Sequence, residues 1–173
     1  EIKVINQFGH LDVLVTNASI ACDSELDMKN KDVFMRILEV NTFGTFNVSR
    51  VFGEEMKKNG SGTIINIAST NGIDTYYEYS LDYDASKAGV ISLTKNLASV
   101  YAPNVRVNSV APGWVKTDMN SDLDKDFMKD EEDKIMLGRF AEPDEIANVV
   151  YFLASKEASY INDSVIRIDG GMK

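Results

Sequence analysis

Four short apolar stretches recur along this chain, and longer segments with helical periodicity separate them. The stretches cover residues 11–16, 63–68, 105–110 and 164–168. Strands that alternate with helices are joined by crossovers, so they pair in parallel and carry helices on both faces. The run Val13-Leu14-Val15 is apolar without alternation, which predicts a strand covered on both faces. The pattern predicts an α/β fold with a doubly wound parallel sheet, in one domain of residues 1–173.

The segments between the predicted strands carry apolar residues at helical spacing. Helices are predicted at residues 1–8, 28–58, 80–101 and 143–154. Gly60 follows the second of these helices, as is usual at a helix C-terminus. Asn41 lies in the middle of that helix and is a mediocre helix former, so we expect a local hydrogen bond or a kink there.

The composition argues against several classes of function. A net charge of −9 does not suit nucleic acid, because phosphate binding needs a basic surface. No apolar run is long enough to span a bilayer and no signal segment opens the chain, so we expect a soluble, cytoplasmic protein without a membrane partner. The single cysteine, Cys22, and the single histidine, His10, cannot supply a zinc site or a Ser/His/Asp triad.

Tyr83 and Lys87 lie four residues apart in a predicted helix, and Ser69 directly follows a predicted strand. Residues at this spacing share one face of a helix. A phenol with a pKa near ~10 exchanges protons poorly at neutral pH, and a fixed ammonium beside it favours the ionised form. Tyr83 would then act as a general acid or base while Ser69 binds a carbonyl or hydroxyl oxygen. Because a Tyr-x-x-x-Lys match is common by chance, a surface tyrosine beside a solvated lysine is the alternative interpretation.

Several motifs, in this order and spacing, resemble the short-chain dehydrogenase/reductase family. They are Asn66-Ile67-Ala68-Ser69 with Gly72, Tyr83-Asp84-Ala85-Ser86-Lys87-Ala88-Gly89, the run from Asn108 to Thr117 containing Pro112-Gly113, and the closing segments 138–143 and 168–172. The resemblance covers essentially the whole chain. It implies a Rossmann-like fold and an NAD(P)-dependent oxidoreductase that interconverts a ketone and a secondary alcohol.

The resemblance also implies roles for individual residues in catalysis. By that match, Tyr83 is the acid/base and Lys87 is its electrostatic partner and a ribose contact. Ser69 holds the reacting oxygen. Asn41 matches the asparagine that kinks its helix and anchors a water in a proton relay.

The same resemblance implies a cofactor site for NAD or NADP. Besides Tyr83 and Lys87, the matching positions are Asn17, Ala18, Ser19, Pro112, Gly113, Val115 and Thr117. The first three belong to Thr16-Asn17-Ala18-Ser19, which resembles the family's Asn-Asn-Ala-Gly motif. Thr16 and Ser19 depart from it, and an ordinary turn after a strand is the alternative interpretation there.

The glycine-rich motif that binds the cofactor diphosphate in this family is not found among the 11 glycines of this sequence. We therefore expect the chain to represent the C-terminal portion of a longer reductase. A second hypothesis follows from the same observation. The chain would then be a catalytically inactive family fragment that acts only as an assembly partner.

The resemblance also implies a substrate class and an assembly. The resemblance is to 3-oxoacyl-[acyl-carrier-protein] reductases, with a small carbonyl or alcohol substrate and a homotetramer or dimer. The family's substrate lid corresponds to residues 118–134, which are mostly acidic and so discount an acidic carrier protein as partner. The aromatic segment Tyr76-Tyr77-Glu78-Tyr79 either lines the pocket or faces solvent.

Overall fold

The computed structural model describes residues 2–120 and 123–172, which form a parallel sheet between two layers of helices. The strands are β1 (Val13–Thr16), β2 (Gly62–Ile67), β3 (Val105–Pro112) and β4 (Val165–Ile168). They lie in the order β1-β2-β3-β4, and every neighbouring pair is parallel. The predicted strands and the α/β, Rossmann-like class are confirmed.

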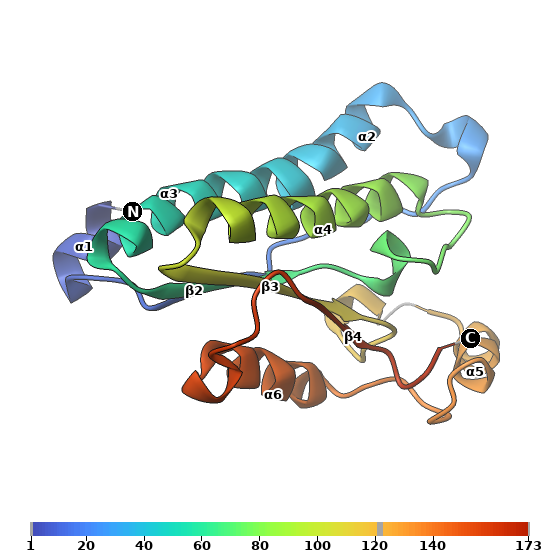
Figure 1. The fold of residues 1–173 in the computed structure, drawn as a ribbon. Coiled ribbons are helices and arrows are strands. Elements are labelled where there is room, and N and C mark those ends of the chain that lie inside the picture. Colours follow the sequence, from blue (N-terminus) through green and yellow to red (C-terminus); the bar gives the residue numbers. More distant parts are fainter. Residues whose placement is uncertain (1, 121–122, 173) are drawn as a thin grey trace.

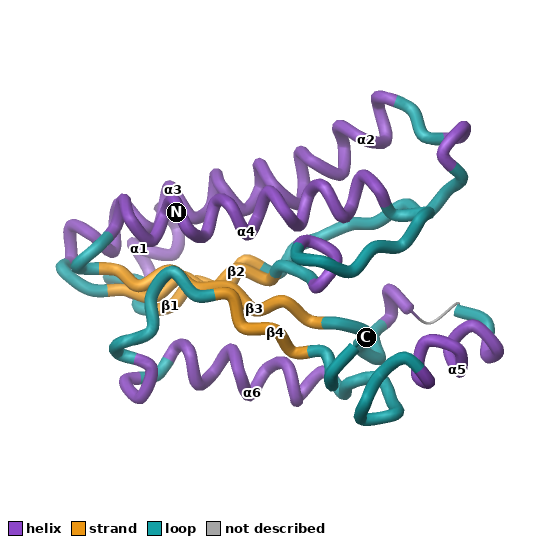
Figure 2. Tube along the Cα trace, turned by 45° about the vertical axis from the view of Figure 1, so that its right-hand side comes forward, coloured by secondary structure: helices purple, strands orange, loops and turns teal. Residues whose placement is uncertain are grey.

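The helices cover the two faces of this sheet unequally (Figure 1). Their bounds are α1 (Ile2–Phe8), α2 (Lys31–Leu38), α3 (Gly44–Asn59), α4 (Leu81–Tyr101), α5 (Lys125–Asp133) and α6 (Pro143–Ala154). The long helices α3 and α4 lie side by side over one face, and α6 lies on the other, as a second view shows (Figure 2). Helix α5 stands apart, beyond the C-terminal ends of the strands.

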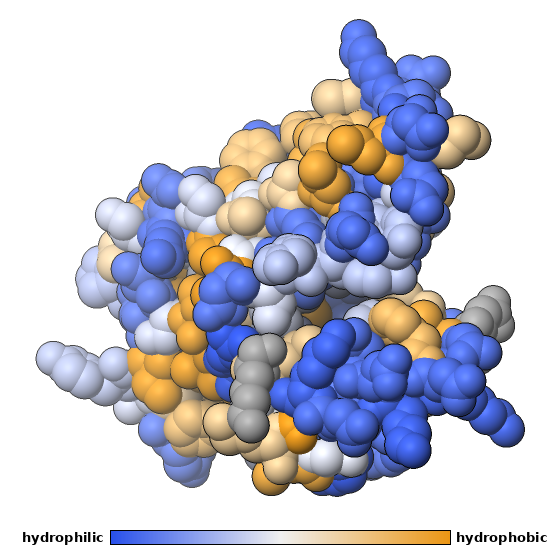
Figure 3. Space-filling view, turned by 90° about the vertical axis from the view of Figure 1, so that its right-hand side faces the viewer, coloured by the Kyte–Doolittle hydropathy of each residue, from blue (hydrophilic) through white to orange (hydrophobic). Residues whose placement is uncertain are grey.

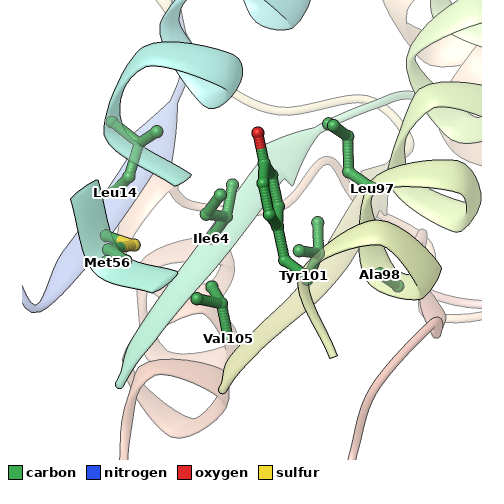
Figure 4. Close-up of a cluster of buried hydrophobic side chains, with 8 residues drawn as sticks. Leu14, Met56, Ile64, Leu97, Ala98, Tyr101 and Val105 are labelled. Carbon is green, nitrogen blue, oxygen red and sulfur yellow. The ribbon is translucent and has the colours of Figure 1, made fainter. Parts of the chain in front are cut away.

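Hydrophobic burial stabilises the packing of these layers. Successive residues of a strand point to opposite faces, so one strand packs against both layers of helices. Ile64 packs with Met56 of α3 and with Tyr101 and Leu97 of α4 (Figure 4). Its neighbour Ile65 packs on the other face in a cluster with α6. The central strands β2 and β3 are therefore covered on both faces, which explains their unbroken apolar runs.

Strand β1 departs from this pattern, and the prediction that its apolar run is covered on both faces holds for Val13 and Leu14 but not for Val15. Leu14 is buried, but Val15 is 41% exposed. Within the described residues β1 pairs on one side, with β2, and α6 lies against β2 and β3 instead. A strand at the edge of the sheet has less cover than its composition predicts.

The helix predicted over residues 28–58 begins at Lys31 and is interrupted once. Asn30 caps α2 by accepting hydrogen bonds from the backbone N–H groups of Asp32 and Val33. A π-helical segment, Glu39–Phe43, joins α2 to α3 and contains Asn41, so the helix is interrupted at the position where a local hydrogen bond or a kink was expected. Gly60 ends α3 at a φ of 83°, a left-handed conformation that glycine adopts without strain.

Candidate active site

Ser69 leaves the C-terminal end of β2 and begins a short 3-10 turn, Thr70–Gly72. Its hydroxyl caps the turn by accepting a hydrogen bond from the N–H of Asn71, at 3.2 Å. The turn lies directly on α4, because a Cβ at Gly72 would lie 2.7 Å from the carbonyl carbon of Lys87. This close approach brings the Ser69 loop to the part of α4 that carries the predicted catalytic residues.

Tyr83 and Lys87 face the same side of α4, as their spacing predicts. The Lys87 ammonium lies 5.4 Å from the centroid of the Tyr83 ring. Lys87 is 3% exposed and donates a hydrogen bond of 2.9 Å to the carbonyl oxygen of Ile67 at the end of β2. Ser69 lies close enough to the Tyr83 side chain to lower the pKa of the phenol. The three predicted residues therefore meet at the C-terminal end of β2.

The electrostatics of this group differ from the expectation that Lys87 favours an ionised tyrosine. Burial raises the pKa of Tyr83 to about 12, and hydrogen bonding with Ser69 opposes the shift. The carboxylates of Asp84 and Asp23 raise the same pKa further. Burial also lowers the pKa of Lys87 to about 8. Desolvation disfavours both charged forms, so Tyr83 is a protonated phenol at neutral pH.

Asn41 is 1% exposed and ties two other segments to the π-helical bend. Its side-chain oxygen accepts from the N–H of Ile20 at 2.8 Å, and its amide group donates to the carbonyl of Ile20 at 2.9 Å. The amide also donates to the Ser86 hydroxyl at 2.9 Å. These bonds connect the loop after β1 with α4 between Tyr83 and Lys87.

The segment after β1 lies beside the same group of residues. Thr16 donates a hydrogen bond of 2.7 Å to the side-chain oxygen of Asn66, and Asn66 donates to Thr94 at 2.9 Å, so Thr16 supports the sheet. Asn17 and Ala18 are exposed. The Ser19 hydroxyl is buried and finds no hydrogen-bond partner among the described residues. A buried hydroxyl without a partner fits a polar ligand group at this position.

The predicted residues after β3 gather at the same edge of the sheet. Pro112 ends β3, and Gly113 donates a hydrogen bond of 2.9 Å to the carbonyl of Ile168 at the end of β4. Val115 accepts from the side-chain amide of Asn120 at 2.8 Å, and Thr117 is exposed. Ligands of parallel α/β sheets bind at the C-terminal ends of the strands, where these residues lie.

An aromatic group that the sequence did not single out joins α5 to this edge. Trp114 stacks on Phe140 with ring centroids 5.4 Å apart and meets Phe127 of α5 edge-on at 5.9 Å. Phe127 in turn lies 5.9 Å from Tyr77. Within the aromatic segment, Tyr77 packs against Phe127 while Tyr76 is 87% exposed and faces solvent. The contact between Tyr77 and Phe127 joins residues 50 positions apart, so periodicity gives no signal for it.

The surface at this end of the molecule reflects the acidic composition of α5. Figure 3 shows a hydrophilic area over α5 and a notch between it and the part of the molecule formed by α2. Glu131 of α5 is largely buried and accepts from the indole N–H of Trp114 at 2.9 Å. Helix α5 is thus held against the strand ends by aromatic contacts and by a carboxylate.

Comparison with known proteins agrees with this geometry. Residues 2–173 match a family model described as enoyl-(acyl carrier protein) reductase. The chain is 42% identical over 171 residues to the 3-oxoacyl-[acyl-carrier-protein] reductase FabG of Thermotoga maritima, covering 98% of this chain and 69% of that protein. It is 40% identical over 172 residues to carbonyl reductase family member 4 of Xenopus laevis, covering 99% of this chain and 70% of that protein.

Solved structures give the same result. A gluconate 5-dehydrogenase from Burkholderia cenocepacia, in complex with NADP and tartrate, superposes with a TM-score of 0.93 at 30% identity, covering 98% of this chain and 67% of that chain. Its bound NADP supports nicotinamide cofactor use by proteins of this fold. None of the helices in residues 2–120 and 123–172 is both long and apolar enough to cross a bilayer. By sequence and by structure, the chain belongs to the short-chain dehydrogenase/reductase family of oxidoreductase enzymes.

Proposed function

We propose that this chain interconverts a ketone and a secondary alcohol with NAD or NADP, and that its substrate is a 3-oxoacyl thioester. The observation that carries the proposal is the meeting of Ser69, Tyr83 and Lys87 at the strand ends. The relatives named as 3-oxoacyl-[acyl-carrier-protein] reductases support the choice of substrate.

The protonation states of these residues suit the reducing direction. Tyr83 is a neutral phenol at pH 7, since burial raises its pKa from an ordinary 10 still further from neutrality, to about 12, and it therefore has a proton to donate to a carbonyl oxygen. The Ser69 hydroxyl hydrogen-bonds the same oxygen and stabilises the charge that develops on it. Lys87 lies over the ring and stabilises the phenolate that remains. The nicotinamide cofactor, when bound, supplies the hydride.

The remaining predicted residues have supporting roles in this proposal. Asn41 holds the bend that connects the loop after β1 with α4 and anchors the water of a proton relay. Lys87 and Ser19 offer a donor and an unpartnered hydroxyl to the ribose and nicotinamide part of the cofactor. The cofactor contacts also include Asn17, Ala18, Pro112, Gly113, Val115 and Thr117.

We also propose that residues 1–173 act as one NAD(P)-binding unit of a cytoplasmic homotetramer or homodimer. Support for self-association comes from apolar side chains that α3, α4 and the bend before α3 leave exposed. Phe43 is 57%, Val48 39% and Val100 53% exposed. Burying such side chains in a subunit interface removes them from water.

The Tyr83→Phe variant tests the proposed chemistry. This change removes the phenolic proton and keeps the ring, so turnover of a 3-oxoacyl thioester should fall by about 100-fold or more. The free energy of unfolding, measured with urea, should change little. Tyr76→Phe, at an exposed position of the neighbouring loop, is the matched control and should keep full activity. A Tyr83→Phe protein that reduces the thioester at the parent rate would remove Tyr83 from the mechanism.

The substrate is tested separately, by comparing acyl-carrier-linked and carrier-free 3-oxoacyl thioesters with a keto sugar acid. Preference for either thioester supports the proposal. Preference for the keto acid would instead place the chain with the gluconate dehydrogenases in substrate use, and leave the roles of the catalytic residues intact.

A further inference from the structure

A buried ion pair lies directly beside the catalytic tyrosine. The Lys29 ammonium is 2.8 Å from a carboxylate oxygen of Asp82, and their side chains are 7% and 0% exposed. Lys29 also donates a hydrogen bond of 2.7 Å to the carbonyl oxygen of Cys22. It thereby joins the loop after β1 to the first turn of α4.

Asp82 passes this connection on to Tyr83. The carboxylate oxygen that binds Lys29 also accepts the backbone N–H of Tyr83 at 3.0 Å. The N–H groups in the first turn of a helix lack partners within the helix, and they need an acceptor from elsewhere. Ser80 precedes α4 but its side chain does not cap the helix, because it donates to Asp84 instead. Asp82 therefore fixes the backbone of Tyr83, and Lys29 fixes Asp82.

Lys29 supplies the positive charge that pairs with the buried Asp82 carboxylate. The second oxygen of Asp82 is buried and has no hydrogen-bond partner among the described residues. Asp23 lies close to the pair, since Lys29, Asp82 and Asp84 all influence its carboxylate. Without the ammonium, a fully buried carboxylate would stand unpaired one residue from Tyr83. Burying an unpaired charge is strongly unfavourable, so the first turn of α4 would have to move or Asp82 would have to turn outward.

We propose that Lys29 is a positioning residue for catalysis, which acts through Asp82 to hold the backbone of Tyr83 in the reactive position. This inference rests on the proposed function, since it assigns Tyr83 as the group that exchanges the proton. Lys29 lies 54 residues before Tyr83, and neither the motif match nor helical spacing indicates it.

The test compares Lys29→Met, Asp82→Asn and the double variant, all made in the full chain. Lys31→Met is the matched control, because Lys31 is exposed in the same part of the chain. In Lys29→Met, kcat for the thioester should fall by about tenfold or more with KM nearly unchanged, because the reacting proton is misplaced while the substrate contacts remain. The double variant should regain most of kcat, since the side-chain amide introduced by Asp82→Asn keeps an acceptor for the Tyr83 N–H and carries no charge.

Hydrogen exchange of the Tyr83 amide provides a measurement that needs no turnover. It should become about tenfold faster in Lys29→Met, at a temperature where urea unfolding shows the variant folded, and should return toward the parent rate in the double variant. If Lys29→Met exchanges and turns over like Lys31→Met, the inference is wrong. If its loss of kcat is not recovered in the double variant, the inference is also wrong. If no variant turns over the thioester, the parent included, the proposed function fails and the exchange rates alone decide the role of Lys29.

Discussion

Gly72→Ala tests the packing that brings the Ser69 loop onto α4. A Cβ at Gly72 would lie 2.7 Å from the carbonyl carbon of Lys87, 2.8 Å from the nitrogen of Ala88 and 2.9 Å from the Lys87 oxygen. All three are backbone atoms of a long helix, so no flexible side chain can turn away to make room. Either the 3-10 turn or α4 must shift.

The expected cost follows from two opposing effects. Inserting a methyl group into a closely packed contact costs about 1–3 kcal/mol. Alanine also restricts the unfolded chain, which returns about 0.4–1 kcal/mol where the backbone conformation is allowed. The net loss in the free energy of unfolding should be about 1–2 kcal/mol. Thioester turnover by the folded protein should also fall, because displacing the turn moves Ser69 away from Tyr83.

Urea unfolding at 25 °C, together with thioester turnover on the folded protein, measures both effects. Gly44→Ala is the matched control. A Cβ at Gly44 meets its nearest neighbour, the Glu39 oxygen, at an ordinary 3.6 Å, so this change should be neutral or stabilising. If Gly72→Ala unfolds and turns over like Gly44→Ala, the loop does not depend on close contact with α4.

Two further predictions concern a buried lysine and a partly buried arginine. The free energy of unfolding of Lys87→Met, measured with urea, is compared with that of the parent. The advantage of the variant over the parent should shrink by about 2 kcal/mol between roughly pH 7 and pH 9.5. The reason is that folded Lys87 has a pKa of about 8, below its ordinary 10.5, so between these values the unfolded parent binds more protons and the parent becomes more stable as pH rises. A pH-independent difference would contradict the assigned burial of the ammonium. Arg106→Met should destabilise by about 2–3 kcal/mol, because it removes the guanidinium group that donates to the carbonyl oxygens of Leu153 and Ser155. The exposed Arg36→Met is its control and should cost less than about 1 kcal/mol, so equal losses in the two variants would refute the argument.

The order of helices and strands could be predicted because it depends on local patterns. Apolar periodicity placed α4 and α6 within a residue of their observed ends, and Gly60 ends α3 as expected. An interruption of the helix at Asn41 was also predictable, since asparagine is a mediocre helix former. Periodicity did not reveal that β1 lies at the edge of the described sheet, because its composition is that of a central strand.

The candidate site, too, could be predicted only in part from the sequence. The sequence placed Ser69 after a strand and Tyr83 and Lys87 on one helix face, and the structure brings these residues together. The sequence did not predict the direction of the Tyr83 pKa shift. Burial is the largest cause of that shift, and the degree of burial depends on everything that packs around the ring.

By itself, the sequence determined the α/β class, the helix that carries Tyr83 and Lys87, and the family, since each follows from short local patterns and from their order along the chain. The tertiary structure decided which groups are dehydrated and which charges face one another. The Lys29 and Asp82 pair, 53 residues apart, and the contact between Tyr77 and Phe127, 50 residues apart, exist because folding brings distant segments together. Desolvation and Coulomb interactions depend on distance in space, and the spacing of residues along the chain does not specify that distance.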